Sequence, residues 1–331
     1  RGDRGDLRGA LMRLLVLLLC LLALPAAAEG TKPERFRAAF ADWLKDRGAT
    51  RGVLAIRRDG VPVSVWSTGT DRDAALPLAS LSKAITAVCV SELVRSGALT
   101  YDTEARAVLG LPAAAPATVA ALLNHATGLE HDRTQGAMSW WRDDPTPRWP
   151  ELTEAALDPA RMTAGAAEYY YSNENYAVLG SVIESVTGQD YVTACRDRVL
   201  TPAGVRATAD PSFAAYLPWG GWRMTMADYA GFLDHYYGND GVLGGRLRRL
   251  PRVRIEGPVH YGLGMVQRDM SPGVNVWHFG SLCFEDGPNF GTYAVHWRIG
   301  WTVTAWYDAC LEGAGMIALD QAMVRVAYAP E

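Results

Sequence analysis

Ser80 and Lys83 are the residues whose types and spacing first suggest chemistry. They occur in the stretch 78–87, Leu-Ala-Ser-Leu-Ser-Lys-Ala-Ile-Thr-Ala, which predicts an apolar helix running to about Arg95. Residues three apart on a helix lie on the same face, so the two side chains can touch. A serine hydroxyl is a poor nucleophile until a base takes its proton, and free N–H groups at a helix start can stabilise negative charge. The pattern predicts a nucleophile and its base; the alternative is an N-capping serine followed by a surface lysine.

Lysine is rare in this chain, which makes its position informative. Of the 32 basic residues only three are lysines, at positions 32, 45 and 83. Arginine does not give up its proton in a protein, whereas a desolvated lysine can. A lysine one turn after Ser80 is therefore expected to accept a proton.

A second group of candidates is Tyr171-Ser172-Asn173, just before a predicted helix at about 174–187. A tyrosine can pass protons when a neighbouring cation such as Lys83 lowers its pKa. Asn173 can orient that lysine and hydrogen-bond a substrate carbonyl. The alternative is a buried aromatic cluster with an N-cap at Asn173.

A third group, His278-Phe279-Gly280-Ser281, falls on a predicted strand. A glycine in a strand lets the backbone approach a ligand closely, so the N–H of Ser281 can join that of Ser80 in an oxyanion hole. His278 can supply positive charge or relay a proton. The alternative is an incidental strand histidine.

Composition narrows the function classes. The chain has 331 residues, 49% of them hydrophobic, and a formal net charge of -4. These values are typical of a globular protein and argue against nucleic-acid binding, since the one dense basic run is 246–249. No C-x-x-C pair occurs and the other histidines lack ligand spacing, so no metal site is expected.

The order of predicted elements indicates an α/β (α+β) fold. Segments 29–70 and 255–331 are expected to form one antiparallel sheet flanked by helices, and 71–254 an inserted, mostly helical subdomain within a single catalytic domain, 29–331. An irregular segment, 130–164, is expected to line the site or flex over it. The expected strands are 53–56, 61–66, 274–284, 292–298 and 302–307, and the expected helices are 36–44, 80–95, 117–124, 174–187, 189–199, 226–237 and 315–329.

The first 28 residues predict export. Met12-Arg13, an apolar run at 14–24 and a small-residue end at 26–28 form a secretory signal peptide, preceded by upstream residues. We expect a periplasmic or secreted protein with no stable membrane anchor after the signal is removed. Four cysteines then remain, which allow three pairings; we favour Cys283 with Cys310, at the ends of two predicted strands.

In this order and spacing, the motifs resemble those of the serine penicillin-recognising enzymes, in particular class C β-lactamases, DD-peptidases and related esterases. The correspondence covers nearly all of 29–331. The motifs are Ser80-Leu81-Ser82-Lys83 as S-x-x-K, Tyr171-Ser172-Asn173 as Y-x-N and His278-Phe279-Gly280 as [K/H]-x-G. Secondary marks are His125-Ala126-Thr127-Gly128-Leu129, Gly220-Gly221-Trp222 leading into Asp228, and Tyr261-Gly262-Leu263-Gly264.

The resemblance implies a β-lactamase/penicillin-binding-protein-like fold, an acyl-enzyme mechanism, and no metal or cofactor. Ser80 would attack a carbonyl, and Lys83 and Tyr171 would share the proton transfers, with the choice of base left open. The implied catalytic residues are Ser80, Lys83, Tyr171, Asn173 and His278, and those implied for the substrate and its oxyanion are Ser80, Ser281, Gly280 and Phe279.

Two departures from the family pattern bear on the substrate. His278 stands where typical class C β-lactamases have lysine, and Phe279 stands where a hydroxyl often helps to bind a substrate carboxylate. The histidine is more like the residue of DD-peptidases and D-amino-acid peptidases, and the missing hydroxyl at Phe279 weakens the case for efficient β-lactam hydrolysis. Tryptophans at 140, 141, 219, 222 and 277 could build an aromatic-walled pocket, although tryptophans are more often core residues.

The sequence thus predicts an exported serine hydrolase acting on a small molecule or peptide: a cell-wall peptide, a β-lactam or an ester. An esterase or peptidase ranks above a true β-lactamase. The alternative is a penicillin-binding-like sensor, or a non-catalytic cell-wall binding protein, that acylates without turnover.

Overall fold

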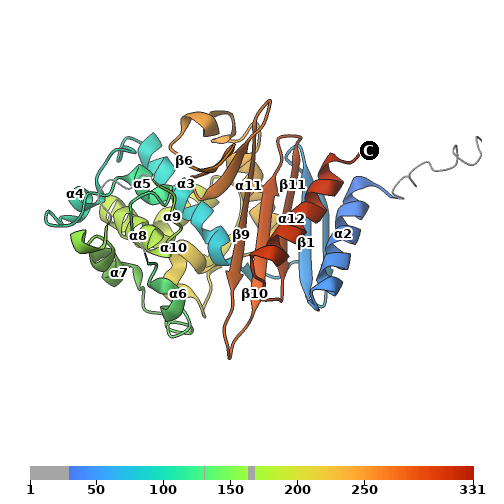
Figure 1. Ribbon diagram of the computed structural model, residues 1–331, viewed down its shortest axis with the longest axis horizontal. Coiled ribbons are helices and arrows are strands. Elements are labelled where there is room, and N and C mark those ends of the chain that lie inside the picture. Colours follow the sequence, from blue (N-terminus) through green and yellow to red (C-terminus); the bar gives the residue numbers. More distant parts are fainter. Residues whose placement is uncertain (1–29, 130, 163–167) are drawn as a thin grey trace, which may run out of the picture.

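The computed structural model describes residues 30–129, 131–162 and 168–331. The predicted signal peptide in residues 1–28 lies outside these ranges. Figure 1 shows a large sheet with two helices in front of it and a group of helices to one side. The predicted α/β class is confirmed.

The large sheet has eight strands in the order β2-β1-β11-β10-β9-β8-β7-β6, and every neighbouring pair is antiparallel. The order places the first two strands of the chain beside its last strand, so both ends of the sequence build one sheet. Its strands are β1 (Gly52–Arg58), β2 (Val61–Thr68), β6 (Val253–Glu256), β7 (Val259–Gly262), β8 (Met265–Asp269), β9 (Val274–Leu282), β10 (Phe290–His296) and β11 (Trp301–Tyr307).

Asp59 and Gly60 connect β1 to β2, as the sequence predicts. Both residues have positive φ, 48° and 77°. This is the backbone conformation of the two-residue turns whose twist matches paired antiparallel strands. The turn therefore sets the pairing of β1 with β2, in which Arg58 lies opposite Val61.

One face of the sheet is covered by the first and last described helices, α2 (Lys32–Asp46) and α12 (Gly313–Tyr328), which lie side by side (Figure 1). Thr31 and Glu34 form a capping box that begins α2. The helices bury aromatic and aliphatic side chains against alternate residues of the strands. This second core includes Phe36, Phe40, Trp43, Leu319, Met323, Leu54, Ile56, Tyr293, Val303 and Tyr307.

The other face carries α11 (Met226–Tyr237), which contacts β1, β10 and β11, and the main hydrophobic core. A three-stranded sheet, β3-β5-β4, lies among the helices. Its strands are β3 (Leu76–Pro77), β4 (Ala207–Ala209) and β5 (Trp222–Met224). The remaining helices are α3 (Ser82–Arg95), α4 (Ala105–Leu109), α5 (Val119–Leu123), α6 (Thr134–Ala137), α7 (Trp149–Ala156), α8 (Asn173–Thr187), α9 (Tyr191–Cys195) and α10 (Leu217–Gly220).

Two predictions about secondary structure were wrong. The segment 130–164 is not irregular throughout, because it contains α6 and α7. Pro150, at the first turn of α7, removes only an N–H that has no partner in a helix start. Strands β6, β7 and β8 were missed because they have only four or five residues each and an exposed, arginine-bearing outer edge.

No helix among residues 30–129, 131–162 and 168–331 is long and apolar enough to cross a membrane. The predicted disulfide is confirmed: Cys283 and Cys310 are bonded, with a Cα–Cα distance of 5.4 Å. It joins the segment after β9 to the segment after β11. Cys89 and Cys195 are free and buried.

Replacing both bonded cysteines, in Cys283→Ser/Cys310→Ser, is expected to destabilise the chain by about 3–4 kcal/mol, because the bond closes a loop spanning 27 positions in the unfolded chain. Urea unfolding measures the change. A reducing agent should lower the midpoint of the unmodified chain to that of the double variant and leave the variant itself unaffected. Equal midpoints without reductant would contradict the expectation.

Candidate active site

Ser80 lies in a 3-10 turn, Ala79–Leu81, immediately before α3 rather than inside that helix. Ala79 has φ of 47°, a left-handed conformation that residues other than glycine rarely adopt. Such backbone strain is found where a fold must hold a functional side chain in place. The turn leaves Ser80 half-buried, while Lys83 is fully buried in the first turn of α3.

Ser80 Oγ contacts both predicted proton-transfer groups. Lys83 Nζ lies 3.1 Å from it, and the Tyr171 hydroxyl donates to it over 3.0 Å. Lys83 Nζ also donates to the carbonyl oxygen of Trp219 at 3.0 Å. Lys83 and Tyr171, which follows Ser80 by 91 positions, thus both lie within hydrogen-bond distance of the serine hydroxyl.

Burial shifts the pKa values of Lys83 and Tyr171 in opposite directions. It lowers the pKa of Lys83 from its ordinary 10.5 to about 7, partly offset by the negative charge of Asp132. Burial also raises the pKa of Tyr171 well above its usual value, which the hydrogen bond to Ser80 only partly offsets. The predicted lowering of the tyrosine pKa by Lys83 is therefore wrong, and Tyr171 is a neutral hydrogen-bond donor.

Aromatic rings surround the lysine. Its ammonium nitrogen lies 4.9 Å from the ring centre of Tyr171 and 5.7 Å from that of Tyr176. The His125 ring packs against both tyrosines, at centroid distances of 4.5 and 5.1 Å. These faces attract a cation weakly but supply no charge, so desolvation dominates.

His125 also holds Tyr171 in place. Its carbonyl oxygen accepts the N–H of Tyr170 at 2.8 Å, and its Nδ1 accepts the N–H of Ser172 at 3.2 Å. The residues on both sides of Tyr171 are therefore anchored to one histidine. The sequence alone identifies His125 only as part of a secondary family mark.

Strand β9 approaches Ser80 along a free edge. Strand β8 pairs with β9 only from Val274 to Trp277, which leaves 278–282 unpaired on that side. A methyl group on Gly280 would lie 2.9 Å from Ser80 N and 2.8 Å from the carbonyl oxygen of Leu78. Glycine is therefore required for the close approach. Ser281 follows on the same strand, and its pairing with the Ser80 N–H in an oxyanion hole stays a prediction.

His278 is buried, and its predicted positive charge is not available. Burial, and then the charge of Lys83, lower the pKa of His278 to about 3. Its Nδ1 lies 2.5 Å from the Phe279 carbonyl oxygen, to which it donates, so Nε2 is left to accept from the Tyr261 hydroxyl at 3.2 Å. His278 is a neutral member of the aromatic group around Lys83.

Phe279 does not face Ser80. Its ring stacks on Tyr293, at a centroid distance of 4.9 Å, and packs in the core beneath α2 and α12. Neighbouring residues of a strand point to opposite faces, so a strand that aims His278 at the lysine aims Phe279 away from it. The five tryptophans do not line a common pocket: Trp219 and Trp222 are core residues, and Trp277 lies with Phe279. Trp140 is 85% exposed, and Trp141 packs against the main core.

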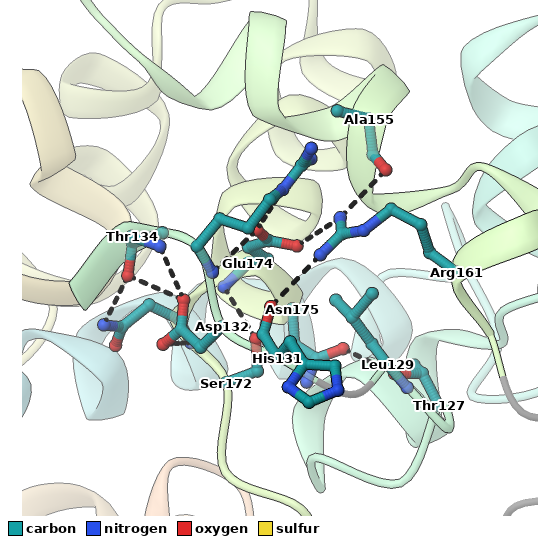
Figure 2. Close-up of polar contacts among 12 residues, drawn as sticks. Thr127, Leu129, His131, Asp132, Thr134, Ala155, Arg161, Ser172, Glu174 and Asn175 are labelled. Carbon is teal, nitrogen blue, oxygen red and sulfur yellow. Dashed lines mark hydrogen bonds and ion pairs between the residues drawn. The ribbon is translucent and has the colours of Figure 1, made fainter. Parts of the chain in front are cut away.

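Asn173 lies at the first position of α8, but its amide does not hydrogen-bond Lys83. Its Nδ2 donates to Thr134 Oγ1 at 2.8 Å, and its backbone N–H donates to Asp132 Oδ2 at 2.9 Å. Figure 2 shows Asp132 and Thr134 beside the start of α8. Sequence reasoning missed both residues and the Trp219 carbonyl, because each acts through a contact distant in sequence, and it named Tyr261 only as part of a secondary family mark.

Among residues 30–129, 131–162 and 168–331, no three histidine, cysteine or acidic side chains are grouped to hold a metal ion. The chemistry that the described groups can perform is proton transfer at a nucleophilic hydroxyl. A serine hydroxyl within hydrogen-bond distance of a lysine of pKa about 7 and a neutral tyrosine, at the junction of this sheet and these helices, defines the class of serine hydrolases.

Comparison with known proteins gives the family. A family model described as Beta-lactamase matches residues 36–298. The chain therefore belongs to the Beta-lactamase family, and the predicted resemblance is confirmed at that level.

One curated protein and two solved structures illustrate what the chain is similar to in sequence and in fold. Penicillin-binding protein 4 of Amycolatopsis lactamdurans is 32% identical over 139 residues, which cover 40% of this chain and 35% of that protein. The match spans about a third of the length of that relative. The octameric penicillin-binding protein homologue from Pyrococcus abyssi has a TM-score of 0.73 at 19% identity, over 90% of this chain and 78% of that one. The D-amino acid amidase from Ochrobactrum anthropi SV3 has a TM-score of 0.72 at 19% identity, over 88% and 99%.

Lys83→Met is expected to abolish hydrolysis and to raise the thermal unfolding temperature. Between pH 7 and pH 10.5, Lys83 binds fewer protons in the folded chain, where its pKa is about 7, than in the unfolded chain, where its pKa is the ordinary 10.5. The stability of the unmodified chain then rises across this window by roughly 1.4 kcal/mol per pH unit. The unfolding temperature of Lys83→Met should therefore be higher than that of the unmodified chain, and the difference should be larger at pH 6 than at pH 9.

Scanning calorimetry at the two pH values measures this difference. Lys45→Met, at an exposed lysine, is the matched control and should show neither the loss of activity nor the pH-dependent gap. A Lys83→Met protein that retains a tenth of the activity, or a gap that is equal at both pH values, would show that Lys83 is not a desolvated base.

Proposed function

We propose that the chain is an exported serine hydrolase that cleaves an amide or ester through an acyl-enzyme at Ser80, with Lys83 as the general base. The observation that carries the proposal is that Ser80 Oγ is 3.1 Å from a buried lysine whose pKa is about 7. Such a group is about half deprotonated at neutral pH, where a general base is most effective. The predicted signal peptide and the disulfide, a bond typical of exported proteins, support export.

The steps follow from the contacts. Neutral Lys83 takes the Ser80 proton as Oγ bonds to the substrate carbonyl carbon, whose oxygen becomes negative. The N–H groups of Ser80 and Ser281 are the proposed donors to that oxygen. The C–N or C–O bond then breaks, and the leaving group receives a proton through the Tyr171 hydroxyl, which Lys83 replenishes. Water attacks the acyl-enzyme with Lys83 again as base, and Ser80 and a carboxylic acid are regenerated.

The site favours a leaving group without a carboxylate. A free carboxylate at this point needs a cation or a hydroxyl to bind it. Lys83 is buried and hydrogen-bonded to Ser80 and Trp219, and His278 is neutral. Phe279 faces the opposite side of the sheet. We therefore rank uncharged amides and esters above penicillins and peptides that end in a free carboxylate. The name of the structurally similar D-amino acid amidase is compatible with this order.

The test combines turnover with intact-protein mass spectrometry. Substrates are a p-nitrophenyl ester, an amino acid amide, a D-alanyl-D-alanine peptide and benzylpenicillin. Ser80→Ala should lose turnover and adduct by at least about a hundredfold, as expected for loss of a nucleophile. Ser96→Ala, at the other end of α3, is the matched control. We expect kcat/KM for the ester or the amide to exceed that for either carboxylate-bearing compound by tenfold or more.

Three results would decide against parts of the proposal. Full turnover by Ser80→Ala would exclude the acyl-enzyme. Benzylpenicillin or the peptide as the best substrate would exclude the preference for an uncharged leaving group. A lasting adduct at Ser80 without product would make the chain the penicillin-binding-like sensor that the sequence also allows.

A further inference from the structure

Asp132 and Thr134 form a small polar cluster at the start of α8, next to the active-site residues but outside the predicted site (Figure 2). Asp132 Oδ1 accepts the backbone N–H of Thr134 at 2.9 Å and its hydroxyl at 2.8 Å. Asp132 Oδ2 accepts the backbone N–H of Asn173 at 2.9 Å and the side chain of Gln135 at 3.2 Å. One carboxylate thus binds the 132–135 turn to the first residue of α8.

The directions of these hydrogen bonds are fixed by chemistry. An ionised carboxylate can only accept, so the Thr134 hydroxyl must donate its single proton to Asp132. Thr134 Oγ1 is then left as an acceptor, and it receives Nδ2 of Asn173 at 2.8 Å. This assigns the amide of Asn173: its NH₂ faces Thr134, and its carbonyl oxygen takes no part in the contact with Thr134.

That carbonyl oxygen is buried, and no described group of the protein donates to it. Asn173 itself is only 3% exposed. A buried acceptor without a partner is costly, so its retention at this point favours a ligand that donates to it. Asn173 lies two residues after Tyr171, whose hydroxyl reaches Ser80, so a substrate N–H bound at this site is a donor of the kind that the free oxygen requires.

Asp132 also supplies negative charge to the lysine. Among the described residues, Lys83 is surrounded by Ser80, the Trp219 carbonyl, the rings of Tyr171 and Tyr176, and the neutral histidines 125 and 278, and the charge of Asp132 acts on it. Asp132 is the carboxylate that opposes the effect of burial on the pKa of Lys83. The same residue therefore influences the proposed base and the amide beside it.

We propose that Asp132 is a positioning residue of the active site, which acts through Thr134 to present the carbonyl oxygen of Asn173 and which holds the start of α8 against the Ser80–Lys83 pair. This role rests on the proposed function of the chain as a hydrolase. Asp132 touches neither the nucleophile nor the base, and its effect on them passes through Asn173 and through its charge.

A second cluster provides the comparison for a purely structural role. Glu174, the next residue of α8, is fully buried and pairs with Arg161 at 2.7 Å and with Arg133 at 3.1 Å. Arg161 also donates to the carbonyl oxygens of Ala155 and His131 (Figure 2). Glu174 anchors the same turn to the same helix, but it has no link to the Asn173 amide. Its loss should reduce stability without changing the behaviour of Lys83.

The test measures the rate at which a fluorophosphonate labels Ser80 as a function of pH, by mass spectrometry, together with ester kcat and KM. The acid limb of the profile is the pH range in which the labelling rate falls because Lys83 becomes protonated. Asp132→Asn removes the charge that raises the pKa of Lys83, so this acid limb should move to lower pH. The maximum rate at higher pH, the plateau, should fall by about tenfold because Asn173 is no longer held in place. Thr134→Val keeps the charge of Asp132 and removes the hydroxyl that links Asp132 to the Asn173 amide. It should lower kcat about tenfold, leave KM within twofold and leave the acid limb in place. Thr134→Ser should restore kcat.

Glu174→Gln is the structural control. It should lower the unfolding temperature and leave the acid limb where it is. The proposal is overturned if Asp132→Asn keeps the acid limb and plateau of the unmodified chain, or if Thr134→Ser is as slow as Thr134→Val. It is also overturned if Glu174→Gln moves the limb as far as Asp132→Asn does.

Labelling requires an activated Ser80 but no release of product. A chain that is labelled and yet hydrolyses no ester or amide would therefore contradict the proposed function, while the pH dependence of labelling in the variants would still decide the role of Asp132.

Discussion

Among the residues that the structure describes, no carboxylate pairs directly with the buried Lys83, and the rest of the site depends on this constraint. An ammonium group loses hydration when it is enclosed, and aromatic faces and a single backbone carbonyl replace only part of it. The amine responds by giving up its proton near neutral pH. A neutral amine beside a serine hydroxyl is a base, and the same environment keeps Tyr171 and His278 neutral. Electrostatics thus divides the roles among groups that lie within one small volume.

Holding a desolvated lysine in place costs stability, which the surrounding packing must offset. The core around α3 and α8, together with the large sheet, provides this packing. Two hydrogen bonds then hold the turn that carries Ser80. The Tyr229 hydroxyl of α11 donates to the Leu81 carbonyl oxygen at 2.9 Å, and Thr292 of β10 donates to that of Leu78 at 2.9 Å. Both carbonyls flank Ser80. The strained turn at Ala79–Leu81 is therefore hydrogen-bonded both to a helix and to the large sheet, and the active site lies where these two meet.

The sequence was informative where chemistry is local and less so where it depends on tertiary contacts. The spacing of Ser80 and Lys83, the turn at Asp59-Gly60 and the bond between Cys283 and Cys310 follow from helix period, turn chemistry and strand ends. The roles of Asp132 and the Trp219 carbonyl do not, since they meet Asn173 and Lys83 across 41 and 136 positions. The alternation of strand residues could have excluded Phe279 once His278 was assigned to the site. No local pattern reveals that His278 is too deeply buried to be charged.

The most direct test of this account is the titration of Lys83 itself. Only three lysines occur in the chain, so an NMR titration of protein with ¹³C-labelled lysine gives a spectrum simple enough to assign through Lys83→Met. The account predicts that the signal missing from the variant titrates with a midpoint about 7 in the unmodified protein. A Lys83 signal that remains that of an ammonium group up to pH 9 would contradict the role of Lys83 as the base, and with it the mechanism proposed for Ser80.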